Sequence, residues 1–338
     1  MAVPTTTVST ARPALTSGAA SSDAALRGIR AGRRRRRLTV LAFLSPWLVG
    51  FTVFFAYPLV MTVYYSFNRF DLLTPPHWVG MANYTFFLHK DPDVWKAVHN
   101  TIWLTVVMVP LRMVFGLFVA VSIVRVKRGA GFFRTVAYLP SLAPPVAATI
   151  AFVFLLNPAT GPVNRVLKLV GVNGPLWFND PSWSKPGLVS LSLWGVGDIM
   201  IIFLAGLLNV PGELYEAACL DGANAWRRFR HITIPTISPV LMFAAVTGVI
   251  QTLQYFTQAA VAAQVASGKA TVGEGIGNQL GYPQMSTMTF PELLYTRGFA
   301  NYLLGYASAL AVVLFVVAFA FTALLLSRAR SFFGGEAA

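Results

Sequence analysis

Long apolar runs alternate with short polar segments along the chain. Six runs are long enough to cross a bilayer as helices, because a hydrocarbon core of about 30 Å requires roughly 20 residues. They cover residues 38–66, 98–124, 136–157, 187–209, 236–259 and 301–326. None alternates apolar and polar residues with a period of two, which argues against a membrane β-barrel. The pattern therefore predicts an all-α polytopic membrane protein with about six transmembrane helices.

Composition and charge agree with this class. The chain has 338 residues, of which 56% are hydrophobic and 11% charged, and its formal charge is +14. Soluble domains carry about 25% charged residues, and nucleic-acid-binding proteins of such positive charge are not normally so apolar. We therefore expect no nucleic-acid partner. The single cysteine, Cys219, excludes an internal disulfide, and the four histidines show no metal-ligand spacing, so no metal site is expected.

The N-terminal segment 1–37 is rich in Ala, Ser and Thr, has little to bury and ends in a basic run, Arg33 to Arg37. We expect this segment to be disordered and cytoplasmic. A twin-arginine or cleavable signal is an alternative. The run from Leu38 is long for a signal core, however, and five more runs follow, which favours an uncleaved first span. The predicted organisation is segment 1–37, a transmembrane domain at 38–330 and a short cytoplasmic tail at 331–338.

The distribution of basic residues predicts the sidedness. With the N-terminus inside, 17 of the 26 Lys and Arg residues fall in inner segments, eight fall in outer loops, and Arg112 alone lies in a span. Inner loops of membrane proteins are enriched in Lys and Arg. We therefore expect a multi-pass protein of the plasma or inner membrane, with both termini in the cytoplasm.

A polar segment at 210–235 joins the fourth and fifth runs on the predicted inner side. Pro211 is placed near the start of a short helix, and Gly222 allows the left-handed turn that ends it. A second short helix is expected from Asn224 to about His231, after which Pro235 opens the next span.

This segment resembles the cytoplasmic loop of permease subunits in binding-protein-dependent ABC importers. Their pattern is E-A-A, three residues, G, nine residues, then I-x-L-P. The matching residues here are Glu216, Ala217, Ala218, Gly222, Ile232 and Pro235, with Ile234 in place of Leu. The extended pattern, which includes Asp221, is similar to the carbohydrate-importer branch.

Weaker matches extend the resemblance over roughly 38–330. They are Ser45-Pro46, Tyr57-Pro58, Ser66-Phe67, Val79 to Tyr84, Asn100-Thr101, Phe133 to Thr135, Leu139-Pro140, Gly161, Asn164 and Gly305 to Leu310. The loop 260–300 departs, because the family's Leu-Thr-x-Gly-Gly-Pro stretch is not recognisable there. This departure leaves the role of the loop open.

The resemblance implies a type I, maltose-permease-like fold and a non-catalytic membrane subunit. It also implies several partners: a second homologous permease subunit, two ABC ATPase subunits that bind ATP and Mg, and an extracytoplasmic solute-binding protein. In the family, the segment around Glu216 docks in a groove of the ATPase. The implied solute is a carbohydrate: a sugar, an oligosaccharide or a polyol derivative.

Two other functions remain as alternatives. A stand-alone secondary transporter usually has internal repeats and more intramembrane ionisable groups. A membrane-bound enzyme or sensor needs a catalytic constellation or a sizeable soluble domain, and neither is visible. The chain also lacks a phosphate-binding G-x-x-x-x-G-K-[ST] loop: the nearest approach, Gly268-Lys269-Ala270, has Ala263 at the first glycine position. We therefore expect no bound cofactor in this chain.

Polar residues at membrane depth are candidates for the solute pathway. Arg112 and Asp198 lie near the middle of the second and fourth runs, where they either pair or face the pathway. In the fifth run, five polar residues follow helical spacing: Thr247, Gln251, Gln254, Tyr255 and Gln258. This stripe suits either a hydrated pathway for sugar hydroxyls or hydrogen bonding between spans. Aromatic residues such as Trp194, Tyr255 and Phe256 are candidates for stacking on a sugar ring.

Overall fold

The computed structural model describes residues 39–126, 128–268 and 279–333, with side chains described as far as Ser327. The predicted N-terminal segment 1–37, Lys127 and Lys269 lie outside the described residues. The chain divides into two units at Met61. The described part of the first unit is 39–61, and the second unit contains everything from Thr62 onward.

The first span is a helix from Thr39 to Ser66 that crosses the boundary between the units. Its turn Thr52–Ala56 (η1) is π-helical, and the helix continues as α2 (Tyr57–Ser66). Three aromatic rings four residues apart stack along it: the Trp47–Phe51 centroids are 5.4 Å apart and the Phe51–Phe55 centroids 5.3 Å. Exposed aromatic and aliphatic side chains on one helix suit a lipid environment.

The second unit contains two further unbroken spans, α4 (Val94–Val124) and α16 (Leu304–Phe333). Three other spans are bent pairs of helices. Ala130–Leu142, which comprises α5 (Ala130–Tyr138) and η2 (Leu139–Leu142), meets α6 (Pro145–Leu155) at 97°. Helix α8 (Pro181–Trp194) meets α9 (Gly197–Leu208) at 48°, and Ala225–Thr236 meets α13 (Ser238–Leu253) at 66°. By length and composition, the described chain therefore has six spans when each bent pair counts as one.

These bends correct the prediction of continuous helices in the third, fourth and fifth runs. The first bend lies at Ala143 and Pro144, directly before Pro145 at the start of α6, and the second lies between Trp194 and Gly197, at Gly195 and Val196. Proline lacks an amide donor and glycine has little helical preference, so both weaken a helix at that point. The fifth span also ends at Leu253, not 259, because a separate helix, α14, begins at Thr257. Pro235 does not open this span: it lies in α12 (Ile234–Thr236), and α13 begins at Ser238.

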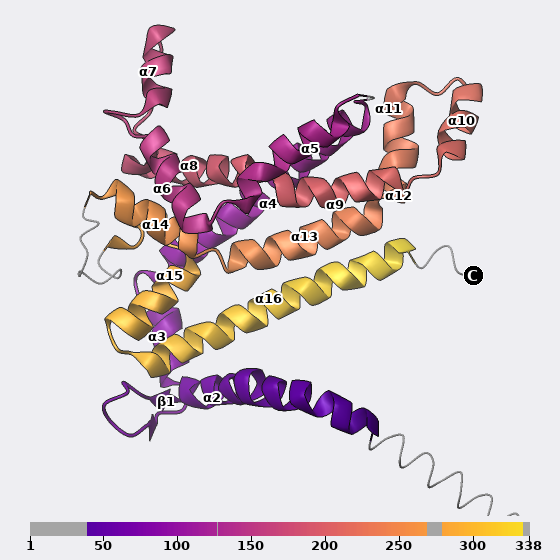
Figure 1. Cartoon of the computed structure of the whole chain (residues 1–338). Coiled ribbons are helices and arrows are strands. Elements are labelled where there is room, and N and C mark those ends of the chain that lie inside the picture. Colours follow the sequence, from indigo (N-terminus) through magenta and orange to yellow (C-terminus); the bar gives the residue numbers. More distant parts are fainter. Residues whose placement is uncertain (1–38, 127, 269–278, 334–338) are drawn as a thin grey trace, which may run out of the picture. The chain divides into compact units, whose positions relative to one another are not determined.

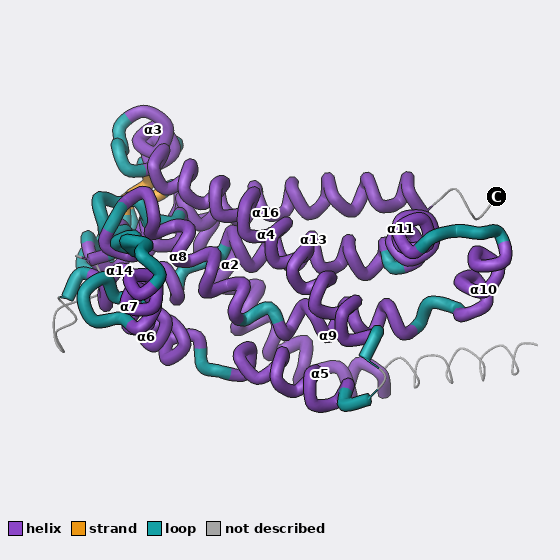
Figure 2. The backbone as a smooth tube through the Cα atoms, turned by 90° about the horizontal axis from the view of Figure 1, so that it is seen from above, coloured by secondary structure: helices purple, strands orange, loops and turns teal. Residues whose placement is uncertain are grey.

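Short elements complete the second unit. The remaining helices are α3 (Ala82–His89), α7 (Pro162–Leu169), η3 (Trp177–Asn179), α10 (Gly212–Leu220), α11 (Ala225–Arg228), η4 (Phe229–Thr233), α14 (Thr257–Ala266), α15 (Phe290–Tyr295) and η6 (Thr296–Ala300). Strands β1 (Asn68–Arg69) and β2 (His77–Trp78) form one antiparallel pair. Within this unit, α10 and α11 lie at one end of the spans, and α3, α7 and α14 lie at the other (Figures 1 and 2).

Helix α4 is the centre of packing in the second unit. It packs against α9, α13 and α8. Ala120 and Ile123 of α4 join Met200 and Phe203 of α9 in one buried cluster. Gly197 brings the start of α9 against α5: a Cβ atom there would lie 2.6 Å from the Ala137 carbonyl oxygen. Small residues permit such close backbone approaches between membrane helices.

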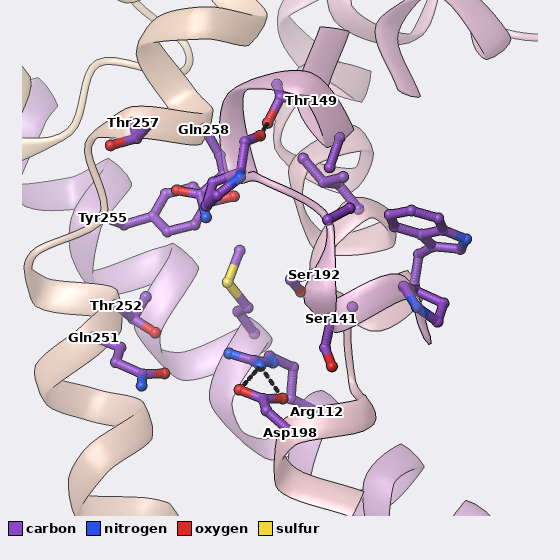
Figure 3. Close-up of a pocket in the computed structure, with 18 of the residues that line it drawn as sticks. Arg112, Ser141, Thr149, Ser192, Asp198, Gln251, Thr252, Tyr255, Thr257 and Gln258 are labelled. Atoms are coloured by element: carbon purple, nitrogen blue, oxygen red, sulfur yellow. Dashed lines mark hydrogen bonds and ion pairs between the residues drawn. The ribbon is translucent and has the colours of Figure 1, made fainter. Parts of the chain in front are cut away.

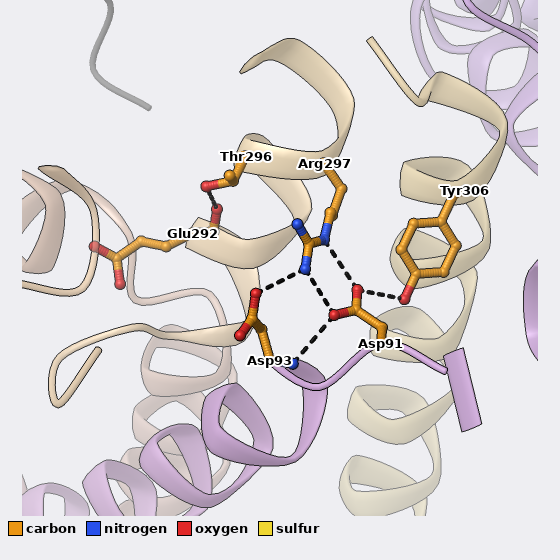
Figure 4. A network of polar contacts seen from close by, with 6 residues as sticks. All are labelled: Asp91, Asp93, Glu292, Thr296, Arg297 and Tyr306. Carbon is orange, nitrogen blue, oxygen red and sulfur yellow. Dashed lines mark hydrogen bonds and ion pairs between the residues drawn. The ribbon is translucent and has the colours of Figure 1, made fainter. Parts of the chain in front are cut away.

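A charged network joins three segments (Figure 4), at the end of the spans that carries α3 and α15, opposite α10 (Figure 1). Arg297 of η6 contacts Asp91 through Nη2 at 2.7 Å and Nε at 2.9 Å, and it contacts Asp93 at 2.7 Å. The Tyr306 hydroxyl of α16 donates to Asp91 at 3.0 Å. Burial is the largest single influence and opposes ionisation of Asp91, but the hydrogen bonds from Arg297, the Asp93 amide and Tyr306 together with the Arg297 charge outweigh it, so the pKa of Asp91 lies below its ordinary value. The network ties η6 and α16 to the start of α4.

Glu292 of α15 is a fully buried carboxyl near this network, yet it does not join it (Figure 4). Its Oε2 accepts from the Thr289 amide at 2.6 Å in a capping box, and its Oε1 has no partner in the described chain. Burial raises the pKa of Glu292 to about 8, against an ordinary value of 4.5. The folded protein therefore favours the protonated carboxylic acid.

We expect stability to fall as the pH rises from 4.5 to 8, because in that window the folded state retains a proton that the unfolded state releases. Glu292→Gln keeps an acceptor for the Thr289 amide and removes this dependence. Between pH 5 and pH 8, the free energy of unfolding of the variant should rise by a few kcal/mol relative to that of the wild type. Thermal unfolding of the purified protein at both pH values measures the gain, with Glu213→Gln at an exposed carboxylate as control. Parallel wild-type and Glu292→Gln profiles would contradict the assignment.

Candidate functional site

A polar cavity of about 440 Å³ opens where the spans are broken. Three of its walls lie at breaks between helices: at 143–144 between η2 and α6, at 195–196 between α8 and α9, and at 254–256 between α13 and α14. The fourth wall is α4, through Met108 and Arg112. Non-helical backbone at membrane depth is stable only beside protein or a water-filled cavity, and broken helices form the solute sites of many transporters.

Hydroxyl groups line much of this cavity (Figure 3). Ser141, Thr149, Ser192 and Thr252 each donate to a carbonyl three or four residues earlier on the chain, at 2.7–2.8 Å. These bonds use the hydroxyl proton and leave oxygen lone pairs. Ser141 and Ser192 are half-buried and are therefore placed to accept hydrogen bonds from a solute, whereas Thr149 and Thr252 are buried.

Three glutamines add amide groups to the same cavity. Gln251, Gln254 and Gln258 line it and form no side-chain hydrogen bond with any other described residue. Each amide offers two donors and an acceptor. Because an unpartnered amide in hydrocarbon costs several kcal/mol, these groups require water or solute around them.

The predicted polar stripe of the fifth run is only partly a helix face. Thr247 and Gln251 lie on α13, Gln254 is its C-terminal cap, Tyr255 is in the following break, and Gln258 is on α14. The break turns the last three toward the same cavity as Gln251. Thr247 instead lines a smaller neighbouring cavity of about 50 Å³, together with Gln251.

Arg112 and Asp198 form an ion pair on the cavity wall. Arg112 Nη2 lies 2.9 Å from Asp198 Oδ1 and 3.1 Å from Oδ2 (Figure 3). The side chains are 19% and 48% exposed, respectively, and both line the cavity. The two alternatives for these residues, pairing or facing an open space, therefore occur together.

Aromatic rings complete the lining. Trp194 is 45% exposed and lines the cavity beside the bend between α8 and α9, and Tyr255 and Phe256 line it from the break after α13. Sequence reasoning missed the hydroxyls of Ser141, Thr149 and Ser192. The proline pair at 144–145 and the glycines at 195 and 197 are the signals that mark these breaks.

The segment 210–235 forms a projecting helical hairpin at the opposite end from the charged network (Figure 1). Helix α10 is followed by Gly222, whose φ is +70°, and Asn224 caps α11 by accepting from the Arg227 amide at 2.9 Å. The Tyr215 hydroxyl lies 2.8 Å from Thr233 Oγ1 and joins the two arms. The predicted left-handed turn at Gly222 is therefore present.

The outer side of this hairpin is open to a partner. Glu216, Ala217 and Asp221 are exposed, whereas Ala218 and Ile232 are half-buried. Leu220 is 90% exposed and Leu214 is 44% exposed.

Known proteins resemble this chain over most of its length. The family described as binding-protein-dependent transport system inner membrane component matches residues 112–331. The probable ABC transporter permease protein YesP of Bacillus subtilis is 33% identical over 285 residues, which cover 84% of this chain and 88% of YesP. The arabinooligosaccharides transport system permease protein AraP of the same organism is 29% identical and covers 86% and 88%.

A solved structure shows the same fold. It belongs to a bacterial ABC transporter involved in the import of the acidic polysaccharide alginate, with a TM-score of 0.74 at 22% identity. The match covers 88% of this chain and 96% of that one. Together with the broken spans and the hairpin after α9, these matches show that this multi-pass membrane protein belongs to the family of inner membrane components of binding-protein-dependent transport systems.

Proposed function

We propose that this chain is one of two permease subunits of an ATP-driven importer that moves a carbohydrate across the cell membrane. The observation that carries the proposal is the polar cavity at the span breaks. It combines hydroxyls, unpartnered amides and aromatic rings around an ion pair with no net charge. Its volume falls in the range of about 300–1,000 Å³ typical of small-molecule sites.

Sugar chemistry matches this lining. A sugar unit presents many hydroxyls, which donate to the serine and threonine oxygens and accept from the glutamine amides. Its C–H faces suit aromatic rings such as Trp194. The names of AraP and the alginate transporter, which refer to arabinooligosaccharides and alginate, support the same class of solute for this chain.

The energy source is assigned to partners. Helix α10 and the turn at Gly222 dock on an ATPase subunit, and two such subunits bind ATP and Mg. An extracytoplasmic binding protein delivers solute to the end that carries α3 and α14. A second homologous permease covers the open side of the cavity. The chain binds and moves solute and performs no covalent chemistry, as is general for permeases of this family.

Affinity purification from native membranes tests the assembly. The proposal predicts that the chain co-purifies with a second permease and an ATPase, and that uptake of the carbohydrate requires ATP. A stand-alone secondary transporter would instead move solute as a purified single chain, driven by an ion gradient. Ion-driven transport by the chain alone would overturn the proposal.

The single cysteine reports the orientation. Cys219 is exposed on α10, so a cytoplasmic hairpin predicts that an impermeant thiol reagent labels it only after the cells are permeabilised. In a Cys219→Ser background, a cysteine in place of the exposed Gln284 should be labelled from outside in intact cells. The reverse pattern would place α10 on the outer side and contradict docking to an ATPase.

A further inference from the structure

The Arg112–Asp198 pair lies between two cavities. The larger cavity is lined by Ser192 and Trp194, which precede Asp198, and the smaller one by Ile199 and Ile202, which follow it. Both residues of the pair line both cavities. The pair therefore stands at the junction of two spaces along the same set of helices.

The order of lining residues shows that the smaller cavity lies nearer the α10 end. On α4, which runs toward that end, Met108 lines the larger cavity and Met113 the smaller. On α13, which runs the other way, Gln254 lines the larger and Thr247 the smaller. Helices α4, α9 and α13 agree, so the pair separates a wide outer space from a narrow inner one.

The pair retains unused hydrogen-bonding capacity. Only Nη2 of Arg112 contacts the carboxylate, so the rest of the guanidinium edge is not used by the pair; Nε has no partner in the described chain but is buried. Asp198 Oδ1 also accepts from the Ile199 amide at 2.7 Å, whereas Oδ2 accepts from Arg112 alone. A carboxylate accepts from two neighbouring hydroxyls, and a guanidinium donates to their oxygens. Vicinal hydroxyls of a solute therefore offer both groups replacement partners.

We propose that the Arg112–Asp198 pair is a latch between the two cavities, and that an uncharged solute part bearing vicinal hydroxyls opens it. This inference rests on the proposed function and adds the class of solute group that the ion pair recognises. Such a group satisfies both charges at once, since it donates to Asp198 and accepts from Arg112. A solute carboxylate would instead bind Arg112 and leave Asp198 without its cation, and a solute cation would do the converse.

The test compares solute-free ATP hydrolysis and solute uptake in the purified, reconstituted complex. Asp198→Asn and the double variant R112Q/D198N remove the ion pair and retain polar side chains, isosteric at position 198 and shorter at position 112. Both should raise solute-free hydrolysis several-fold and lower uptake at least tenfold, because the junction no longer closes. The reversed pair R112D/D198R should return solute-free hydrolysis toward the wild-type rate. Ser122→Ala, on the same helix as Arg112 but lining neither cavity, is the control and should leave that rate unchanged.

Several outcomes would overturn the latch. Wild-type rates of solute-free hydrolysis in both charge-removing variants would show that the pair does not close the junction. A reversed pair that hydrolyses ATP as fast as R112Q/D198N would show that ion pairing is not the closing contact. A wild-type complex that imports no carbohydrate would contradict the proposed function, yet the solute-free rates would still decide the latch.

Discussion

Replacing Gly222 with aspartate, or Glu216 with lysine, is expected to reduce solute uptake at least tenfold while membrane insertion stays near normal. Gly222 has φ +70°, a left-handed conformation that costs other residues roughly 1–2 kcal/mol. A Cβ atom at this position would meet nothing within 4 Å, so the cost comes from the backbone and not from a clash. Glu216 is exposed on α10, where lysine reverses the charge offered to the proposed ATPase partner.

Matched variants separate backbone and charge effects. Asparagine tolerates the left-handed conformation better than other non-glycine residues, so Gly222→Asn should retain more uptake than Gly222→Asp. Glu216→Gln should be milder than Glu216→Lys. The measurement is ATPase co-purification together with uptake by cells. Full uptake and full ATPase association in Gly222→Asp and Glu216→Lys would refute the role of this hairpin.

The second large effect is expected at the glutamines of the cavity. Gln251→Leu and Gln254→Leu should each lower uptake about tenfold and leave assembly and basal ATP hydrolysis largely intact. Both amides face the cavity and bond to no other described side chain or backbone group. Leucine removes their donors and acceptors without breaking a contact between helices.

A structural role for these glutamines makes the opposite prediction. If their amides joined spans in the assembled transporter, leucine would lower the thermal stability of the complex. The complexes that still assemble would then take up solute at the normal rate. Uptake and stability are measured on the same preparations. Gln264→Leu on α14 is the control, because this glutamine does not line the cavity. Normal uptake with a destabilised complex would show that the glutamines are structural.

The spans could be predicted from the sequence because hydropathy is a local property, and the hydrocarbon core requires a run of apolar residues long enough to cross it. The turn at Gly222 could also be predicted, because local residues mark the helix boundaries: Pro211 the start of the first helix, Gly222 its end and Asn224 the start of the second. Hydropathy averages over a window, however, so three bent spans were expected as continuous helices. The prolines at 144–145 and the glycines at 195 and 197 were visible, but their consequence depends on a cavity being present to accept irregular backbone.

Long-range contacts were beyond sequence reasoning. Asp91 and Arg297 are separated by 206 positions, and nothing local indicates that they pair. The pairing of Arg112 with Asp198 was one of two alternatives, because equal depth in two spans does not fix which faces meet. In loop 260–300, where the family pattern is absent, the described residues form the end of α14, the capped helix α15 and η6.

Uptake in proteoliposomes tests the central claim most directly. The complex purified from native membranes is reconstituted with its binding protein, ATP is enclosed on the side of α10, and a labelled neutral oligosaccharide is added outside. The account predicts accumulation that requires ATP and the binding protein and that Gln251→Leu lowers about tenfold. Accumulation that is independent of ATP, or equal uptake by wild type and Gln251→Leu, would contradict it.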